Sequence, residues 1–232
     1  MLLYGDSLAS ESQNAFRFAL RGVDVWTRVY PGSTICGWFP DMRADATSFH
    51  PDVVVAEFVG VDFSSCFTAR APPTASWPTI VATFQADART ATAIFTRSGT
   101  QVIWVGVPPT LFSADRSEPD ALAALADSAT GVAYVDAGQA VAPGDVFTWT
   151  LPCLPYEPNC HAGQVVVRAP DGDHFCPVKS GPECPVWNGG AFRFGVAMAD
   201  AAAQALADRG FAGFENQLWE YLTARDCFSR CN

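Results

Sequence analysis

The amino-acid sequence predicts an α/β protein: a single-domain, three-layer α/β/α fold with a parallel, flavodoxin-like central sheet of about five strands. Short apolar runs alternate along the chain with longer segments in which apolar residues recur at helical spacing. The short runs are apolar throughout, which is typical of strands buried on both faces of a parallel sheet. A chain of 232 residues can bury one sizeable core, so we expect a single domain over 1–232.

Five of the apolar runs are the expected strands of this sheet. In chain order they are Leu2–Gly5, Val23–Tyr30, Asp52–Gly60, Gln101–Val107 and Val132–Asp136. A further apolar run, Val165–Arg168, precedes a polar motif near the C-terminus. Because reactive groups in open α/β sheets gather beyond the carboxyl ends of the strands, the residues that follow these runs are candidates for a shared site.

Helices are expected between the strands. In the first, Phe16 and Leu20 share a face, Ser10 and Gln13 are a candidate capping box, and Gly22 suits the helix end. The other expected helices are Pro78–Arg97, Pro119–Ala126 and Phe192–Asp208. Two segments rich in proline and cysteine are interpreted as long surface loops, Pro143–Asn159 and Pro177–Val186.

Composition and charge exclude several classes of protein. Hydrophobic residues make up 49% of the chain and charged residues 16%, which excludes a disordered chain. The 14 lysines and arginines are outnumbered by 24 acidic residues, for a net charge of −10, so no nucleic-acid partner is expected. No apolar run approaches the ~18 residues of a membrane span, so we expect no transmembrane segment in this chain. We also expect a monomer.

Eight cysteines are many for a cytosolic chain of this length. There is no Cys-x-x-Cys pair and there are only three histidines, so disulfides formed in an oxidising compartment are favoured over a zinc site. The expected pairs, of which those in short loops carry most weight, are Cys36–Cys66, Cys153–Cys160, Cys176–Cys184 and Cys227–Cys231. We therefore expect a secreted or cell-envelope-exposed protein. Because the first strand begins at Leu2, we infer that an upstream signal, anchor or domain has been removed.

Two polar motifs near opposite ends of the chain indicate nucleophilic catalysis. Gly5-Asp6-Ser7 places a serine directly after the first apolar run, and Asp171-Gly172-Asp173-His174 places a carboxylate three residues before a histidine. A serine hydroxyl, an imidazole and a carboxylate that orients the imidazole are the parts of a nucleophilic hydrolase. A serine at a strand-to-helix turn also offers its backbone amide to an oxyanion, because early helical amides lack partners.

The remaining histidines and three of the tryptophans are interpreted as structural. His50 lies beside Pro51 at the start of an expected strand, and His161 lies beside a cysteine. The tryptophans interpreted as core residues are Trp26, Trp104 and Trp219.

The two motifs, with others between them, resemble the sequence blocks of the SGNH (GDSL-type) hydrolases. Gly5-Asp6-Ser7-Leu8 resembles the nucleophile block, Pro31–Cys36 the glycine block, and Arg168–Pro177 the acid–base block. Phe58–Cys66 resembles a block that usually carries asparagine directly after its glycine, and Gly190–Phe194 resembles the start of the last helix. The order and spacing of these blocks extend over nearly the whole chain. Within the superfamily, the chain resembles the secreted or surface-attached actinobacterial branch.

This resemblance implies roles for individual residues. Ser7 would be the nucleophile, and His174 the general base and then the general acid. Asp171 would orient His174, because the family spacing is Asp-x-x-His, and Asp173 is the competing carboxylate. The backbone amides of Ser7 and Gly32 would bind the oxyanion.

One position departs from the family pattern. Val61 stands where the family places its asparagine, and a shift of the register by one residue places Asp62 there. A valine side chain cannot donate a hydrogen bond, and an ionised aspartate would repel an oxyanion. Losing one such donor typically costs about 10²–10³ in rate, so we expect slowed catalysis. Side chains that are candidates to replace the donor are Asn14, Asn188 and Thr34.

The resemblance implies a serine esterase, a carboxylic ester hydrolase that needs no metal and no organic cofactor. Its expected substrate is a small ester or an acylated glycan or lipid, with an O-acetyl or other short acyl group. Trp38 and Trp187 are candidates to line the acyl or sugar pocket. Two alternatives stay open: an acyltransferase domain that moves acyl groups to a sugar hydroxyl, and a non-catalytic binding domain on a decayed hydrolase scaffold, which Val61 would suit.

Overall fold

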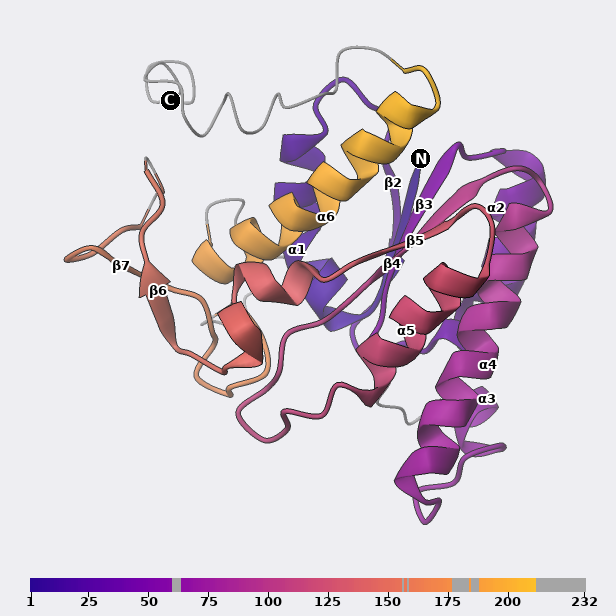
Figure 1. Cartoon of the computed structure of the whole chain (residues 1–232), viewed down its shortest axis with the longest axis horizontal. Helices are drawn as coiled ribbons and strands as arrows, with labels where there is room; N and C mark the ends of the chain where they lie inside the picture. The colour runs from indigo at the N-terminus through magenta and orange to yellow at the C-terminus, as the bar shows by residue number, and fades with distance from the viewer. Residues whose placement is uncertain (60–63, 156, 158, 177–183, 185–187, 212–232) are drawn as a thin grey trace.

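The computed structural model describes residues 1–59, 64–155, 157, 159–176, 184 and 188–211. Within these residues, a five-stranded parallel sheet forms the centre of the molecule (Figure 1). Its strands are β1 (Leu2–Gly5), β2 (Trp26–Val29), β3 (Val53–Glu57), β4 (Gln101–Val105) and β5 (Val132–Val135). The strand order is β2-β1-β3-β4-β5, which is the flavodoxin-like order. The predicted fold class is therefore confirmed.

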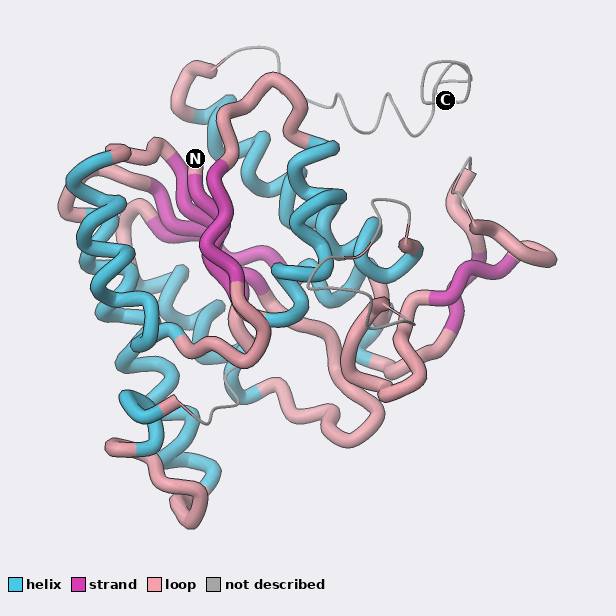
Figure 2. The backbone as a smooth tube through the Cα atoms, turned by 180° about the vertical axis from the view of Figure 1, so that it is seen from behind, coloured by secondary structure: helices cyan, strands magenta, loops and turns pink. Residues whose placement is uncertain are grey.

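Helices cover both faces of the sheet (Figures 1 and 2). The α-helices are α1 (Ser7–Ala19), α2 (Phe39–Ser48), α3 (Ser65–Thr68), α4 (Trp77–Thr96), α5 (Ser117–Ser128) and α6 (Gly189–Asp208). Three short 3₁₀ helices are η1 (Ile35–Trp38), η2 (Ala137–Ala140) and η3 (Pro143–Asp145). Helices α1 and α6 pack on one face, and α2, α4 and α5 pack on the other.

Alternate strand residues supply the two halves of the core. In β3, Val53 and Val55 pack with the α1 and α6 side chains, whereas Val54 and Ala56 pack with those of α2, α4 and α5. This alternation follows from the pleat, which points successive side chains to opposite faces. Trp104 of β4 is fully buried, as expected from the sequence.

Helix α1 begins earlier than its sequence predicts. Asp6 is its N-cap, and one carboxylate oxygen accepts a hydrogen bond from the Leu8 amide at 3.2 Å. Ser10 and Gln13 are buried inside the helix, where the Gln13 side chain donates to the Ser10 carbonyl. The predicted capping box at Ser10 and Gln13 is therefore wrong, because an acidic cap directly after β1 starts the helix one turn sooner.

The edge strand β2 is shorter than the predicted Val23–Tyr30. It pairs only with β1, and its Trp26 is 46% exposed and packs against the ring of Phe49. The interpretation of Trp26 as a core residue is wrong, because an edge strand is covered less completely than a central one.

The run Val165–Arg168 does not join the central sheet. Strand β7 (Gln164–Val166) pairs antiparallel with β6 (Thr150–Pro152) in a separate two-stranded sheet, which lies apart from the main one in Figure 2. The acid–base motif therefore follows a small hairpin. The sequence-based expectation that it follows a strand of the parallel sheet is wrong. Helix α2 and this hairpin are elements that the sequence did not predict.

Three of the four expected disulfides join described cysteines: Cys36–Cys66, Cys153–Cys160 and Cys176–Cys184. The fourth pair, Cys227 and Cys231, lies outside the described residues, as does Trp219. No helix within the described part of the chain has the length and apolar character needed to cross a membrane.

Candidate active site

A pocket of about 200 Å³ opens at the carboxyl edge of the central sheet. Ser7 lines it from the start of α1, Val59 from the segment after β3, and Val107 from the segment after β4. His174 and Asp173 line it from the loop that follows the small hairpin. The other lining residues are Leu8, Trp77, Pro108, Pro109, Thr110, Ser113, Asp115, Glu118 and Pro119. The structure thus brings Ser7 and His174, 167 residues apart in sequence, to one cavity.

Ser7 is positioned by the residue before it. The carboxylate of Asp6 is buried and accepts two backbone hydrogen bonds, from Leu8 at 3.2 Å and from Val59 at 2.7 Å. The second bond ties the segment after β3 to the first turn of α1. The turn that presents Ser7 is therefore fixed both within α1 and to the segment after β3.

A second buried carboxyl, Glu57, lies beneath this turn. It ends β3, is fully buried, and accepts a hydrogen bond from the Ala9 amide at 2.8 Å. Burial raises the pKa of Asp6 to about 6. Burial, together with repulsion by Asp6, raises the pKa of Glu57 well above its usual value. Ionising both carboxyls at once in this buried site is therefore disfavoured.

His174 and Asp171 are in contact, as expected of a general base and the carboxylate that orients it. His174 Nδ1 lies 2.9 Å from Asp171 Oδ2. The other carboxylate oxygen of Asp171 accepts hydrogen bonds from the backbone amides of Asp173 and His174, both at 3.0 Å. Partial burial opposes ionisation of Asp171, but these amides and the His174 ring outweigh it and lower the pKa of Asp171 to about 2. Of the two candidate carboxylates, Asp171 is the one that contacts the imidazole.

Gly172 makes this tight turn possible. Its φ of +76° is in the left-handed region that glycine adopts without strain. Its carbonyl accepts a hydrogen bond from the Leu111 amide at 2.9 Å, and a β-carbon at this position would lie 2.5 Å from that of Leu111. The acid–base loop therefore packs closely against the loop that follows β4.

Arg168 also joins the acid–base loop to the loop that follows β4. It is 1% exposed, and its guanidinium donates to the Pro109 carbonyl at 2.7 Å and to the Asp173 carbonyl at 3.3 Å. The guanidinium carbon also lies 5.6 and 5.4 Å from the ring centroids of Phe147 and Phe175. Burial lowers the pKa of Arg168 to about 10, so the side chain stays charged at neutral pH. Arg168 thus holds two walls of the pocket together.

The glycine block lies against the end of β1. The Ser33 hydroxyl and the Tyr30 amide both donate to the Gly5 carbonyl, at 3.2 and 3.1 Å. Gly32 has a φ of +72°, but it is not among the described residues that line the pocket. Trp38 packs edge-on against Tyr4, and its indole donates to Ser33. The structure therefore places Trp38 at the margin of the core, and not among the pocket residues.

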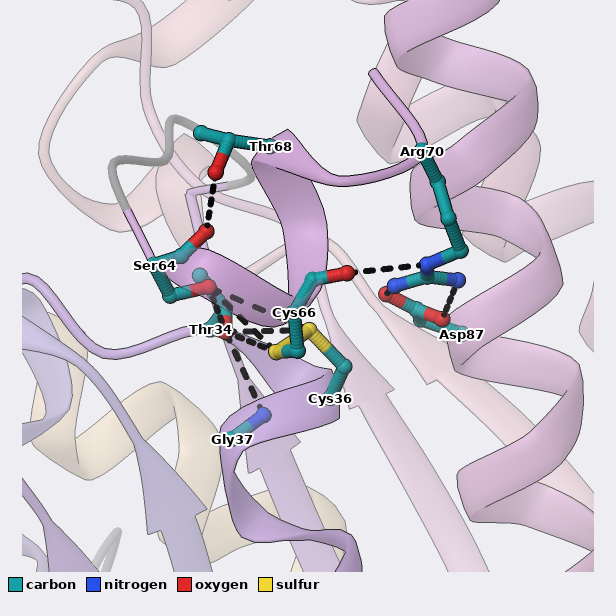
Figure 3. Close-up of a disulfide and its surroundings, with 8 residues drawn as sticks. All are labelled: Thr34, Cys36, Gly37, Ser64, Cys66, Thr68, Arg70 and Asp87. Carbon is teal, nitrogen blue, oxygen red and sulfur yellow. Dashed lines mark hydrogen bonds and ion pairs between the residues drawn. A yellow bond between two sulfur atoms is a disulfide. The ribbon is translucent and has the colours of Figure 1, made fainter. Parts of the chain in front are cut away.

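The disulfide Cys36–Cys66 joins η1 to α3 (Figure 3). Beside it, the hydroxyls of Thr34 and Ser64 lie 2.8 Å apart. Arg70, four residues beyond Cys66, forms a two-bond ion pair with the buried carboxylate of Asp87 on α4. The glycine block and the start of α3 are thus tied to each other and to α4.

The expected oxyanion and binding positions are only partly described. Val61 and Trp187 lie outside the described residues. The three side chains considered as replacement donors contact other groups. Asn14 donates to the Cys184 carbonyl, Asn188 caps α6, and Thr34 accepts a bond from the Gly37 amide. None of the three is among the described pocket residues.

Several pocket residues carried no signal in the sequence. Trp77 is 40% exposed at the start of α4, and Asp115 precedes α5. Neither belongs to a motif, and an isolated tryptophan or aspartate in a sequence does not by itself indicate a pocket residue. His50 and His161 are exposed and are not among the described residues that line the pocket.

Together, these features define a three-layer α/β protein with a serine and a histidine–aspartate pair around one pocket. No protein-family model and no curated protein sequence matches the chain. Among solved structures, a "putative acylhydrolase" from Bacteroides fragilis is similar with a TM-score of 0.50 and 15% sequence identity, over 90% of this chain and 86% of that one.

Two further structures are similar at lower TM-scores. The C-terminal catalytic domain of peptidoglycan O-acetyltransferase A from Streptococcus pneumoniae has a TM-score of 0.49 and 17% identity, over 90% of this chain and 93% of that one. A GDSL-like lipase from Bacteroides thetaiotaomicron has a TM-score of 0.48 and 14% identity, over 90% and 87%. The likeness to the Bacteroides fragilis protein agrees with the strand order and supports the predicted three-layer α/β/α fold. The narrower resemblance to the actinobacterial branch stays a prediction.

Proposed function

We propose that the chain is a serine esterase that hydrolyses carboxylic esters through an acyl-enzyme intermediate. One observation carries this proposal: the 2.9 Å contact between His174 and Asp171 belongs to a histidine that shares a pocket with Ser7. A hydroxyl and an oriented imidazole at one cavity are the parts that acyl transfer requires.

In the proposed mechanism, Ser7 Oγ attacks the ester carbonyl carbon while His174 accepts the hydroxyl proton. The tetrahedral intermediate collapses when His174 returns this proton to the leaving alcohol, and the acyl group stays on Ser7. A water molecule then attacks the acyl-enzyme, again giving its proton to His174, and the acid is released as Ser7 regains the proton. Asp171, ionised because of its low pKa, stabilises the imidazolium at both stages.

The oxyanion would be bound by the backbone amides of Ser7 and Gly32. Val61 offers no side-chain donor at the position where the family places asparagine, so the rate should be lower by about 10²–10³ than with a complete set of donors. The amides of Leu8 and Ala9, which are also in the first turn of α1, donate to Asp6 and Glu57.

The pocket suits a small acyl group. Its volume of about 200 Å³ is below the range of ~300–1,000 Å³ that drug-sized ligands occupy. Apolar side chains of Leu8, Val59 and Val107 line it, and Trp77 and Asp115 add an aromatic face and a carboxylate. We therefore propose acetyl or another short acyl group as the substrate's acid, carried on a carbohydrate or lipid. The disulfides support action outside the cell or at the cell envelope, and we propose a monomer that forms one domain.

The decisive experiment compares initial rates on p-nitrophenyl acetate for the wild type, Ser7→Ala and a control, Ser128→Ala. Ser128 is at the end of α5, where its hydroxyl donates to the Leu125 carbonyl, and it is not among the described pocket residues. We expect turnover above background in the wild type and the control and none in Ser7→Ala. Turnover that survives in Ser7→Ala would refute the proposal.

Additional measurements on the same proteins separate the two alternatives. An acyltransferase would turn over slowly in water and faster when a sugar acceptor is added. A non-catalytic binding domain would bind glycan or lipid after Ser7→Ala, and a fluorophosphonate would not label Ser7 in the wild type.

A further inference from the structure

Glu11 lies one helical turn after Ser7 on α1. Because an α-helix has 3.6 residues per turn, side chains four residues apart share a face. The Glu11 carboxylate therefore lies on the side of α1 that presents Ser7. This residue belongs to none of the motifs that the sequence singles out.

The carboxylate of Glu11 contacts the backbone directly after His174. Its Oε2 accepts a hydrogen bond from the Phe175 amide at 2.7 Å and a longer one from the Cys176 amide at 3.4 Å. Hydrogen bonds to an ionised carboxylate are roughly twice as strong as those between neutral groups. The peptide that follows His174 is thus held to the helix that begins at Ser7.

Further contacts extend this attachment along α1. The Cys184 amide donates to the Glu11 carbonyl at 3.2 Å, and the Asn14 side chain donates to the Cys184 carbonyl at 3.1 Å. The disulfide Cys176–Cys184 connects this second attachment to the first.

The pKa of Glu11 reflects the same surroundings. Burial raises the pKa of Glu11, whereas the Phe175 amide and the nearby His174 ring oppose the rise. Asp171 belongs to the same loop as the imidazole that it contacts. Glu11 belongs to α1 and contacts the backbone of that loop. Asp171 sets the orientation of the ring, but nothing in its contacts relates the loop to Ser7.

We infer that Glu11 is a positioning residue for the esterase reaction: it sets the distance between the nucleophile Ser7 and the base His174 by holding the backbone after His174 to the first turns of α1. The inference rests on the proposed function. The Glu11 carboxylate makes the direct contact with the backbone after His174, over 164 residues of sequence, and the contacts through Cys184 are more remote from the imidazole. Without this carboxylate, the acid–base loop would keep the hydrogen bonds to Asp171 and to Arg168. The distance between His174 and Ser7 would be less well fixed.

The experiment compares Glu11→Ala, Glu11→Gln and a control, Arg17→Ala, with the wild type. Arg17 is an exposed residue of the same helix that bonds to Thr27, away from the loop. For each protein we would measure kcat and KM on p-nitrophenyl acetate, the rate at which a fluorophosphonate labels Ser7, and the melting temperature. All rates are taken well below the lowest melting temperature, so that folded protein is compared with folded protein.

We expect Glu11→Ala to lower kcat and the labelling rate together by about tenfold to a hundredfold, because displacements near 1 Å can cost this much. KM should change less than about threefold, since Glu11 does not line the pocket. Glu11→Gln should keep kcat within about threefold of the wild type, because its amide oxygen accepts the same backbone bonds at reduced strength. Arg17→Ala should behave as the wild type.

Two results would overturn the inference while the proposed function stands. One is a Glu11→Ala protein that melts earlier but keeps the wild-type kcat, which would show that the contact only stabilises the fold. The other is Glu11→Gln as impaired as Glu11→Ala, which would show that the charge matters and the backbone attachment does not. A wild type with neither Ser7-dependent turnover nor labelling would overturn the proposed function and the inference with it.

Discussion

The disulfide Cys36–Cys66 allows a stability prediction with a magnitude. The perturbation is the double variant Cys36→Ser and Cys66→Ser, which removes the link between η1 and α3 (Figure 3). Serine is a suitable replacement at both positions, because the hydroxyls of Thr34 and Ser64 lie within 3.4 Å of the two sulfurs. New hydroxyl groups would therefore find hydrogen-bond partners, and the lost cross-link dominates the effect.

The magnitude follows from the length of chain that each disulfide closes. Cys36 and Cys66 are 30 residues apart, for which the chain-entropy model gives about 12 cal/mol/K, or ~3.6 kcal/mol at 25 °C. The matched control is Cys153→Ser with Cys160→Ser, where the separation is 7 residues and the same model gives ~2.4 kcal/mol. The expected difference between the two double variants is ~1.2 kcal/mol.

The assay is equilibrium denaturation in urea, followed by tryptophan fluorescence under oxidising conditions. Trp104 is fully buried between β4 and α4, where its indole donates to Thr92, so its emission reports loss of the core. The free energy of unfolding should fall more in the variant that lacks Cys36–Cys66. Equal losses, or a larger loss in the short-loop variant, would refute the argument from loop length.

Three further predictions concern the site and its support. Asp171→Asn should lower kcat by about 10²–10⁴, whereas Asp173→Asn should stay within about tenfold; comparable losses in steady-state assays would mean that the wrong carboxylate has been assigned. Arg168→Met should lower the free energy of unfolding in urea by ~2 kcal/mol or more, because the buried Pro109 carbonyl would lose its charged donor; a neutral effect would contradict its role. The raised pKa values of Asp6 and Glu57 mean that the stabilisation from these groups is complete below the unfolded values near pH 4 and is lost as the pH rises through the folded values, about 6 for Asp6. Melting temperatures measured across this range should therefore fall less steeply in Glu57→Gln than in the wild type, and parallel curves would be evidence against repulsion between the two buried carboxyls.

The parallel sheet could be predicted because its central strands are apolar on both faces. Val53–Glu57 and Gln101–Val105 are bounded within a few residues of their predicted limits. At the sheet edge the prediction of a buried tryptophan was wrong, since Trp26 is half exposed; the polar residues Asp24 and Arg28 near it in the sequence are consistent with an edge strand. Helix α2 was missed because it buries only Met42, Asp45 and Ala46 and so lacks a continuous apolar stripe.

The candidate site was predictable where local spacing sets the geometry. The contact between Asp171 and His174 needs only a tight turn with a glycine, which the sequence shows directly. The contacts of Glu11 with Phe175 and of Arg168 with Pro109 span 164 and 59 residues. Such long-range pairs leave no periodic pattern, so they could not be inferred before the fold was known.

The short interval between Ser7 and Glu11 has a consequence for protein engineering. Deleting or adding one residue there would turn the rest of α1 by about 100° and shift it by ~1.5 Å, and Glu11 would then face away from the loop it holds. The loop after β4 exposes Leu111 and Phe112, but Pro109 and the Leu111 amide bond to Arg168 and Gly172. Libraries that aim to reshape the pocket should therefore substitute side chains of that loop and leave its length, and the length of the first turns of α1, unchanged.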